Sequence, residues 1–276
     1  MNGVVLFGLC SALTWGAGDF FGGVAAKRSS LFSVIIFSQI AGAAVLTAMA
    51  LLFAEPLPPF PVLLVGGGAG ILGDIGLMSL YYALSRGKMG VAAPVSGVVA
   101  AMIPVLVGAV VEGLPGALQA AGFVLAVAGI WLVARSETSA MRLTDLGLPI
   151  IAGIGFGVFY IVIDQVSNIA VYWPLVAARL FSITLLVLVG LVLRQPLTPA
   201  RGQLPVIAVS GMLDAGGNVF FALAALAGRL DIAGVLSSLY PATTVVMAGL
   251  FLKERLSRPQ TVGVVATLAA IVLIVL

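Results

Sequence analysis

The 276-residue chain contains no histidine and a single cysteine, Cys10. Histidine and cysteine are the usual protein ligands of zinc and other transition metals, so we expect no such metal site. One cysteine cannot form an internal disulfide. Charged residues are also scarce, at 8% of the chain. A soluble helical protein needs a polar face on each surface helix, and so few charges cannot supply one.

Apolar residues make up 62% of the chain and occur in long runs throughout it. A run of about 20 apolar residues is long enough for one helix to cross the hydrocarbon core of a bilayer. We therefore predict an all-α membrane protein with ten transmembrane helices, which makes the lipid bilayer its first partner. The predicted spans cover about residues 3–24, 32–53, 61–84, 89–111, 116–134, 147–166, 173–193, 204–226, 231–252 and 259–276.

The basic residues fall almost entirely on one side of this layout. Loops after the odd-numbered spans carry Lys27, Arg28, Arg86, Lys88, Arg135, Arg142, Arg194, Arg201, Lys253, Arg255 and Arg258. The opposite face carries Arg229 alone, and Arg179 lies inside the seventh span. Basic loops are retained in the cytoplasm, so we place both termini outside it and expect a multi-pass protein of the inner (plasma) membrane. The net charge of +3 then follows from topology, and we expect no nucleic-acid partner.

Ten spans divide into two halves of five. Because five is odd, two copies of one unit must enter the membrane from opposite sides, which is the inverted-repeat plan of many secondary transporters. We predict a first five-helix repeat at residues 1–135, a linker at 136–146 and a second, inverted repeat at 147–276.

The two predicted halves share ionisable residues at matching depths. Each half has an aromatic residue four positions before an aspartate in its first span and an aspartate at the centre of its third span. The matching residues are Trp15 and Asp19 with Tyr160 and Asp164, and Asp74 with Asp214. Ionisable residues are costly in a membrane, so their recurrence at equivalent depth indicates duplication rather than chance.

The second half contains Tyr240-Pro241, an apolar run, and then Leu252-Lys253-Glu254-Arg255-Leu256 before the last span. This order resembles the EamA-type repeat of the drug/metabolite transporter superfamily, in which a proline-containing helix precedes a Gly-Glu-Arg-Leu loop. Leu13-Thr14-Trp15-Gly16 is similar to the start of that repeat, and Ala178-Arg179 to an arginine in a half's second span. The chain departs from the pattern at Lys253, where glycine is usual, at Val99 in place of proline, and at Gln39 in place of the first-half arginine.

The resemblance implies a ten-helix secondary transporter for small metabolites, working by alternating access without a cofactor. Amino acids and related zwitterions are the expected substrates, and export is the expected direction. The alternative within this fold is an exporter of multiple drugs or lipophilic cations. A channel or a membrane enzyme acting on lipids is disfavoured, and we expect no catalytic activity. The oligomeric state is left open, with a monomer as one option.

Asp74 and Asp214 are the central candidates for the substrate site. An ionisable side chain near the bilayer centre costs about 2.5–3.5 kcal/mol, so it normally faces protein, water or a partner. The two aspartates are candidates to bind a substrate amine or exchange a proton; the alternative is a structural pairing. Arg179 suits a substrate carboxylate and equally suits a salt bridge to one aspartate. With one arginine, the second carboxyl group must be protonated, hydrated or matched by a substrate cation.

Further side chains complete the predicted substrate-binding set. Trp15, Tyr82, Tyr160 and Tyr240 are candidates for an aromatic cavity wall, and Ser237 for a hydrogen bond near Pro241. The alternative for the aromatic residues is packing or a place in an interfacial belt. Asp19 and Asp164 lie nearer the ends of their spans, where we expect gating or coupling groups or else ordinary interfacial charges.

Overall fold

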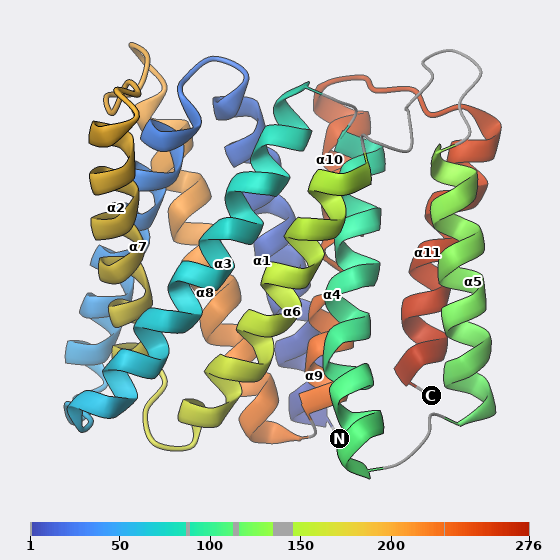
Figure 1. Cartoon of the computed structure of the whole chain (residues 1–276), viewed down its shortest axis with the longest axis horizontal. Helices are drawn as coiled ribbons and strands as arrows, with labels where there is room; N and C mark the ends of the chain where they lie inside the picture. Colours follow the sequence, from blue (N-terminus) through green and yellow to red (C-terminus); the bar gives the residue numbers. More distant parts are fainter. Residues whose placement is uncertain (1, 87–88, 113–115, 135–145, 229, 276) are drawn as a thin grey trace.

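The computed structural model describes residues 2–86, 89–112, 116–134, 146–228 and 230–275. Within these ranges the chain forms eleven α-helices (Figure 1). Their bounds are α1 Asn2–Ala26, α2 Leu31–Leu52, α3 Phe60–Arg86, α4 Met89–Glu112, α5 Ala117–Ala134, α6 Gly147–Ser167, α7 Tyr172–Val192, α8 Leu204–Ala227, α9 Leu230–Ser237, α10 Tyr240–Phe251 and α11 Arg258–Val275.

Seven segments of the described chain are long and apolar enough to cross a membrane. They are Gly3–Ala26, Leu31–Leu52, Phe60–Arg86, Gly147–Ser167, Tyr172–Val192, Leu204–Ala227 and Ile232–Phe251. α4 and α11 contain the shorter apolar stretches Ala92–Pro104 and Thr261–Leu273. The prediction of an all-helical membrane protein is confirmed to this extent, and the number of ten crossings stays a prediction.

The ninth predicted span, 231–252, is interrupted. α9 ends at Ser237 and α10 begins at Tyr240. Pro241, the second residue of α10, has no backbone N–H to donate to a carbonyl one turn earlier. The N–H of Leu239 donates to the carbonyl only three residues before it, at 3.2 Å, and this tighter bond closes α9. The continuous helix predicted here is therefore two shorter helices.

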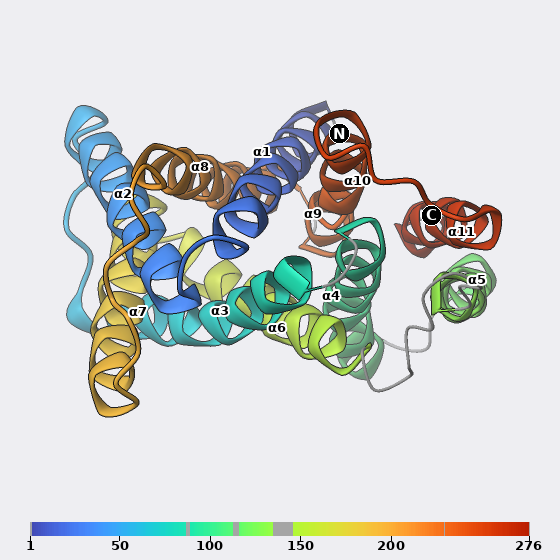
Figure 2. The same cartoon turned by 90° about the horizontal axis from the view of Figure 1, so that it is seen from above.

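Helices of the first half pack mainly against helices of the second. α1 lies against α8, α2 against α7, α3 against α6 and α7, α4 against α6 and α10, and α5 against α11. Seen from above, α5 and α11 stand apart from the other helices (Figure 2). The chain ends marked in Figure 1 lie towards the same side of the helices. The largest fully buried side chains, which include Tyr81, Tyr160, Phe221 and Tyr240, come from both halves.

The turns that follow α2 and α7 have the same conformation. Ala54 and Arg194 both have positive φ, 49° and 51°. The next residue in each turn donates its N–H to a carbonyl five positions earlier, at 2.9 Å for Glu55 and 2.8 Å for Gln195. These equivalent residues are 140 positions apart (194 − 54), and the segments Glu55-Pro-Leu-Pro-Pro and Gln195-Pro-Leu-Thr-Pro begin there. The match ties α2 and α7 to the same place in a repeated sequence.

Glu55 also links the loop after α2 to the start of α7. Its carboxylate accepts hydrogen bonds of 2.7–3.2 Å from the backbone N–H groups of Val171, Tyr172 and Trp173. Trp173 Nε1 donates to the Glu55 carbonyl at 2.9 Å. The N–H groups at a helix start have no partner within the helix, and the helix dipole favours a negative charge there. This contact holds the first turn of α7 against the first half.

Glycine allows α3 to approach α7 closely. A Cβ at Gly70 would lie 2.3 Å from the backbone oxygen of Ala178, and a Cβ at Gly66 would lie 2.5 Å from that of Pro174. Helices in lipid reach such short separations only through small residues. Because Ala178 immediately precedes Arg179, the contact at Gly70 fixes how near the arginine lies to α3.

Replacing Gly70 with alanine is expected to separate α3 from α7. The added methyl group would meet backbone rather than a side chain that can move away, and overpacking of this kind typically costs about 1–3 kcal/mol. Gly68→Ala is the matched control, because a Cβ at Gly68 meets nothing within 4 Å. We expect Gly70→Ala, and not Gly68→Ala, to lower the melting temperature of the purified protein in detergent. Equal melting temperatures would contradict this packing.

Candidate functional site

A cavity lies between the two halves of the chain and contains about 560 Å³ of space free of protein atoms, its mouth included. The cavity is lined by Trp15, Asp19, Gln39, Gly70, Gly73, Asp74, Leu77, Phe156, Phe159, Tyr160, Ala178, Arg179, Ser182, Asp214, Asn218 and Tyr240. Three carboxyl groups and one guanidinium therefore face a largely apolar and aromatic wall.

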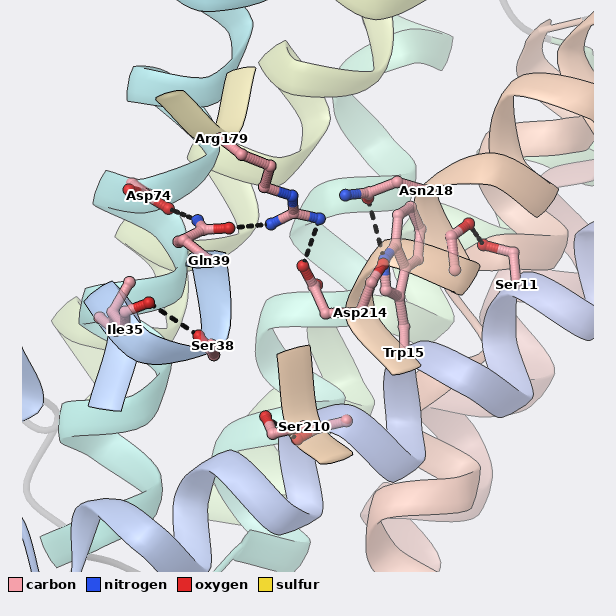
Figure 3. A network of polar contacts seen from close by, with 12 residues as sticks. Ser11, Trp15, Ile35, Ser38, Gln39, Asp74, Arg179, Ser210, Asp214 and Asn218 are labelled. Carbon is pink, nitrogen blue, oxygen red and sulfur yellow. Dashed lines mark hydrogen bonds and ion pairs between the residues drawn. The ribbon is translucent and has the colours of Figure 1, made fainter. Parts of the chain in front are cut away.

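Arg179 on α7 forms an ion pair with Asp214 on α8. Arg179 Nη2 lies 2.6 Å from Asp214 Oδ2, and the two side chains are 6% and 17% exposed (Figure 3). Removing two charges from water is costly, and their mutual attraction offsets this cost only in a close geometry. Asp214 therefore neutralises the arginine directly.

Gln39 on α2 connects this ion pair to Asp74 on α3. Its Nε2 donates to Asp74 Oδ1, and its Oε1 accepts from Arg179 Nη1 (Figure 3). Asp74, Gln39 and Arg179 are all buried. The result is one polar chain, Asp74–Gln39–Arg179–Asp214, whose first two members come from the first half and whose last two come from the second.

Aromatic side chains from both halves form a stack beside this polar chain. Trp15 on α1 stacks on Tyr160 on α6 with ring centroids 5.5 Å apart, and Tyr160 stacks on Phe221 on α8 at 4.7 Å. Trp15 Nε1 donates to Asn218 Oδ1 at 3.0 Å (Figure 3). The ring of Tyr240 lies edge-on to that of Phe156, with centroids 6.2 Å apart, and the Tyr240 hydroxyl forms a hydrogen bond with Ser96. The stack gives the cavity an apolar surface next to its charges.

The structure brings most of the predicted site residues together. Those that line the cavity are Trp15, Asp19, Asp74, Tyr160, Arg179, Asp214 and Tyr240. Asp19 was expected nearer a span end, but it is buried and 5% exposed. Two alternatives were open for Arg179, an internal ion pair or a substrate contact. The ion pair is present, with Asp214 as the partner, and the substrate contact stays a prediction.

Tyr82, Asp164 and Ser237 lie outside the cavity lining. The guanidinium carbon of Arg86 lies 4.2 Å from the centre of the Tyr82 ring, in a cation–π contact. Asp164 is half-buried near the end of α6. Ser237 is fully buried at the end of α9. Their predicted roles in binding and gating stay predictions without support from the cavity.

Five polar or aromatic residues of the cavity were not among the predicted site residues. They are Gln39, Phe156, Phe159, Ser182 and Asn218. Two of them carried a signal in the sequence: Gln39 lies 140 positions before Arg179 (179 − 39), the same spacing as Asp74 and Asp214 (214 − 74). Asn218 follows Asp214 by one helical turn, so the two lie on the same face of α8.

Buried polar atoms without a hydrogen bond cluster at this site. At the cavity, Asp74 Oδ2, Arg179 Nε and Ser182 Oγ are buried with no hydrogen-bond partner; elsewhere among the described residues, Ser237 Oγ is also buried without one. A buried polar group without a partner costs about 1–3 kcal/mol, so native structures rarely keep one without a reason. The three atoms at the cavity comprise an acceptor, a donor and a hydroxyl that can act as either.

The described side chains include no group of three His, Cys, Asp or Glu residues placed to hold a metal ion. The side chains that line the cavity can recognise charged and apolar parts of a ligand. Carboxylates accept hydrogen bonds from cations, the guanidinium donates to anions, and the aromatic stack contacts apolar groups.

The sequence profile of the EamA-like transporter family matches residues 2–135 and again 145–276. The chain belongs to the EamA-like transporter family. Family members are membrane transporters of small molecules and are not enzymes in general, so this chain is an integral, multi-pass membrane transporter. The two matches also show that the family's repeat occurs twice.

Two further comparisons give a relative in sequence and a shared fold. An uncharacterized protein of Methanocaldococcus jannaschii, MJ1333.1, is 30% identical over 129 residues, which are 47% of this chain and 93% of that protein. That relative is therefore about as long as one of the two repeats. A protein of known crystal structure superposes with a TM-score of 0.71 at 17% identity, over 98% of this chain and 96% of the other, which shows a shared fold.

Asp214→Asn is expected to destabilise the protein because Arg179 would lose its directly paired carboxylate. Removing one member of a buried ion pair costs about 3–5 kcal/mol, since the other charge stays buried. Asp164→Asn, the same change at a half-buried aspartate outside the cavity, should have little effect. Thermal unfolding followed by intrinsic tryptophan fluorescence measures both variants, and an unchanged melting temperature for Asp214→Asn would contradict the ion pair.

Proposed function

We propose that this EamA-like protein is a secondary transporter that exports small amine-bearing metabolites, amino acids and related zwitterions above all, across the inner membrane. The observation that carries the proposal is the set of unpartnered atoms in the central cavity. Asp74 Oδ2 offers an acceptor for a substrate ammonium group. Arg179 Nε and Ser182 Oγ offer donors for a substrate carboxylate. An amino acid carries both of these groups.

The aromatic stack suits the rest of such a substrate. Trp15, Tyr160 and Tyr240 line the same cavity as the unpartnered atoms. An aromatic face contacts an apolar side chain and also attracts an ammonium group through the cation–π interaction. We assign Trp15 and Tyr160 to the substrate side chain, Asp74 to its amine and Arg179 to its carboxylate.

We propose alternating access between two inverted five-helix halves as the mechanism. Three observations support the repeat. The helix contacts occur in matching pairs, so that α1 against α8 corresponds to α6 against α3. The 140-residue spacing relates α2–α3 to α7–α8 (Figure 1). A relative about as long as one repeat exists. A site between two such halves can be exposed to each side in turn when they rock against one another.

Export of lipophilic cations is the second candidate function. It is favoured by the cavity's charges, because Asp19, Asp74 and Asp214 outnumber Arg179, which is already paired with Asp214. Counterflow separates the two candidates. Proteoliposomes loaded with an unlabelled L-amino-acid mixture should accumulate the labelled mixture, and excess tetraphenylphosphonium should not compete. Competition by tetraphenylphosphonium alone would favour the cation exporter.

Asp74→Asn is expected to reduce counterflow of the amino-acid mixture at least about tenfold, since a neutral amide loses the charge that attracts the substrate ammonium group. The fold should persist because the asparagine side-chain oxygen can still accept the hydrogen bond from Gln39. Asp164→Asn, the same change at an aspartate outside the cavity lining, is the comparison and should retain more transport than Asp74→Asn. Wild-type uptake by correctly folded Asp74→Asn protein would end the assignment of Asp74 to the substrate amine.

A further inference from the structure

Gln39 and Arg179 occupy equivalent positions in the two halves. They are 140 residues apart, as are Asp74 and Asp214 and the turn residues Ala54 and Arg194. The two side chains meet, since Arg179 Nη1 donates to Gln39 Oε1 (Figure 3). Each also contacts the aspartate of its own half. The four residues of the polar chain thus occupy equivalent positions in the two halves. One equivalent pair is identical, Asp74 and Asp214, and the other differs, Gln39 and Arg179.

An amide is the side chain that fits between a carboxylate and a guanidinium. Its NH₂ group donates to the carboxylate, and its oxygen accepts from the guanidinium, whereas leucine can do neither. A carboxylate in its place would repel Asp74, with which Gln39 is in contact. The amide therefore brings no charge and does not neutralise Asp74. The second oxygen of Asp74 has no hydrogen-bond partner.

We infer that Gln39 is the positioning residue of the substrate site, which holds Arg179 between Asp74 and Asp214 and leaves Asp74 without a directly paired cation, so that it can select a substrate with a positive group. Because positions 39 and 179 are equivalent, we expect that the two side chains can exchange places. One arginine in the central pair is needed, and either half can supply it. An arginine at position 39 would pair with Asp74, while a glutamine at position 179 would donate to Asp214. The assignment of the substrate's positive group rests on the proposed function, whereas the exchange of positions does not.

The test is an exchange of the two side chains. Arg179→Gln alone leaves two buried aspartates without a cation and should lower the melting temperature by roughly 10 °C. The double variant Arg179→Gln/Gln39→Arg contains the same two side chains in exchanged positions, so it should recover at least half of that loss. Arg179→Gln/Gln39→Leu is the matched control and should recover none. An exchange variant that melts no higher than the leucine control overturns the inference.

Transport separates positioning from mere stability. In proteoliposomes, Gln39→Leu should raise the half-saturation concentration for the labelled L-amino-acid mixture about tenfold at a similar maximal rate, and the exchange variant should return it towards wild type. A Gln39→Leu variant whose maximal rate falls at constant half-saturation would contradict a positioning role. The two experiments can also disagree. If the exchange variant recovers its melting temperature but the wild type takes up no amino acids, the proposed substrate is rejected and the inferred exchange of positions stands. If the wild type takes up amino acids but the exchange variant recovers none of its melting temperature, only the exchange of positions is rejected.

Discussion

The structure depends on how the buried guanidinium of Arg179 is neutralised. Arg179 lies 2.6 Å from Asp214 and reaches Asp74 only through Gln39. In a membrane-spanning protein each of these charges would be costly alone, so their helices must stay together. α2, α3, α7 and α8 supply the four residues, two helices from each half. The polar chain is therefore both the link between the halves and the charged part of the cavity.

Close packing is what brings these helices within reach of one another. The contact of Gly70 with the Ala178 backbone places α3 against α7 next to Arg179. On the α2 side, a Cβ at Gly211 would lie 2.0 Å from the Ser38 oxygen, next to Gln39. Glu55 fixes the first turn of α7 by accepting three backbone N–H groups. Small residues and a helix-end carboxylate thus set the distances that the ion pair requires.

Asp74, Arg179 and Asp214, which the sequence singles out, all line the cavity. An ionisable side chain inside an apolar span is costly and therefore conspicuous in the sequence. The neutral amide of Gln39 has no such signal of its own; it stands out through its 140-residue spacing from Arg179 and as the residue in place of the first-half arginine of the EamA pattern. Tyr82 was predicted for the cavity, yet the neighbouring Tyr81 is the buried one, with its hydroxyl 3.0 Å from Ser210. Adjacent residues differ by about 100° around a helix, and uniformly apolar spans carry too little amphipathic pattern to fix that angle.

The central claim is that two inverted halves enclose one charged site, and an experimental structure in lipid nanodiscs tests it most directly. The account predicts that a rotation of about 180° around an axis in the membrane plane superposes α2–α3 on α7–α8, with Gln39 on Arg179 and Asp74 on Asp214. It also predicts that Arg179 remains in contact with Asp214. An axis along the membrane normal, or an Asp74 and Asp214 pair facing lipid, would contradict it.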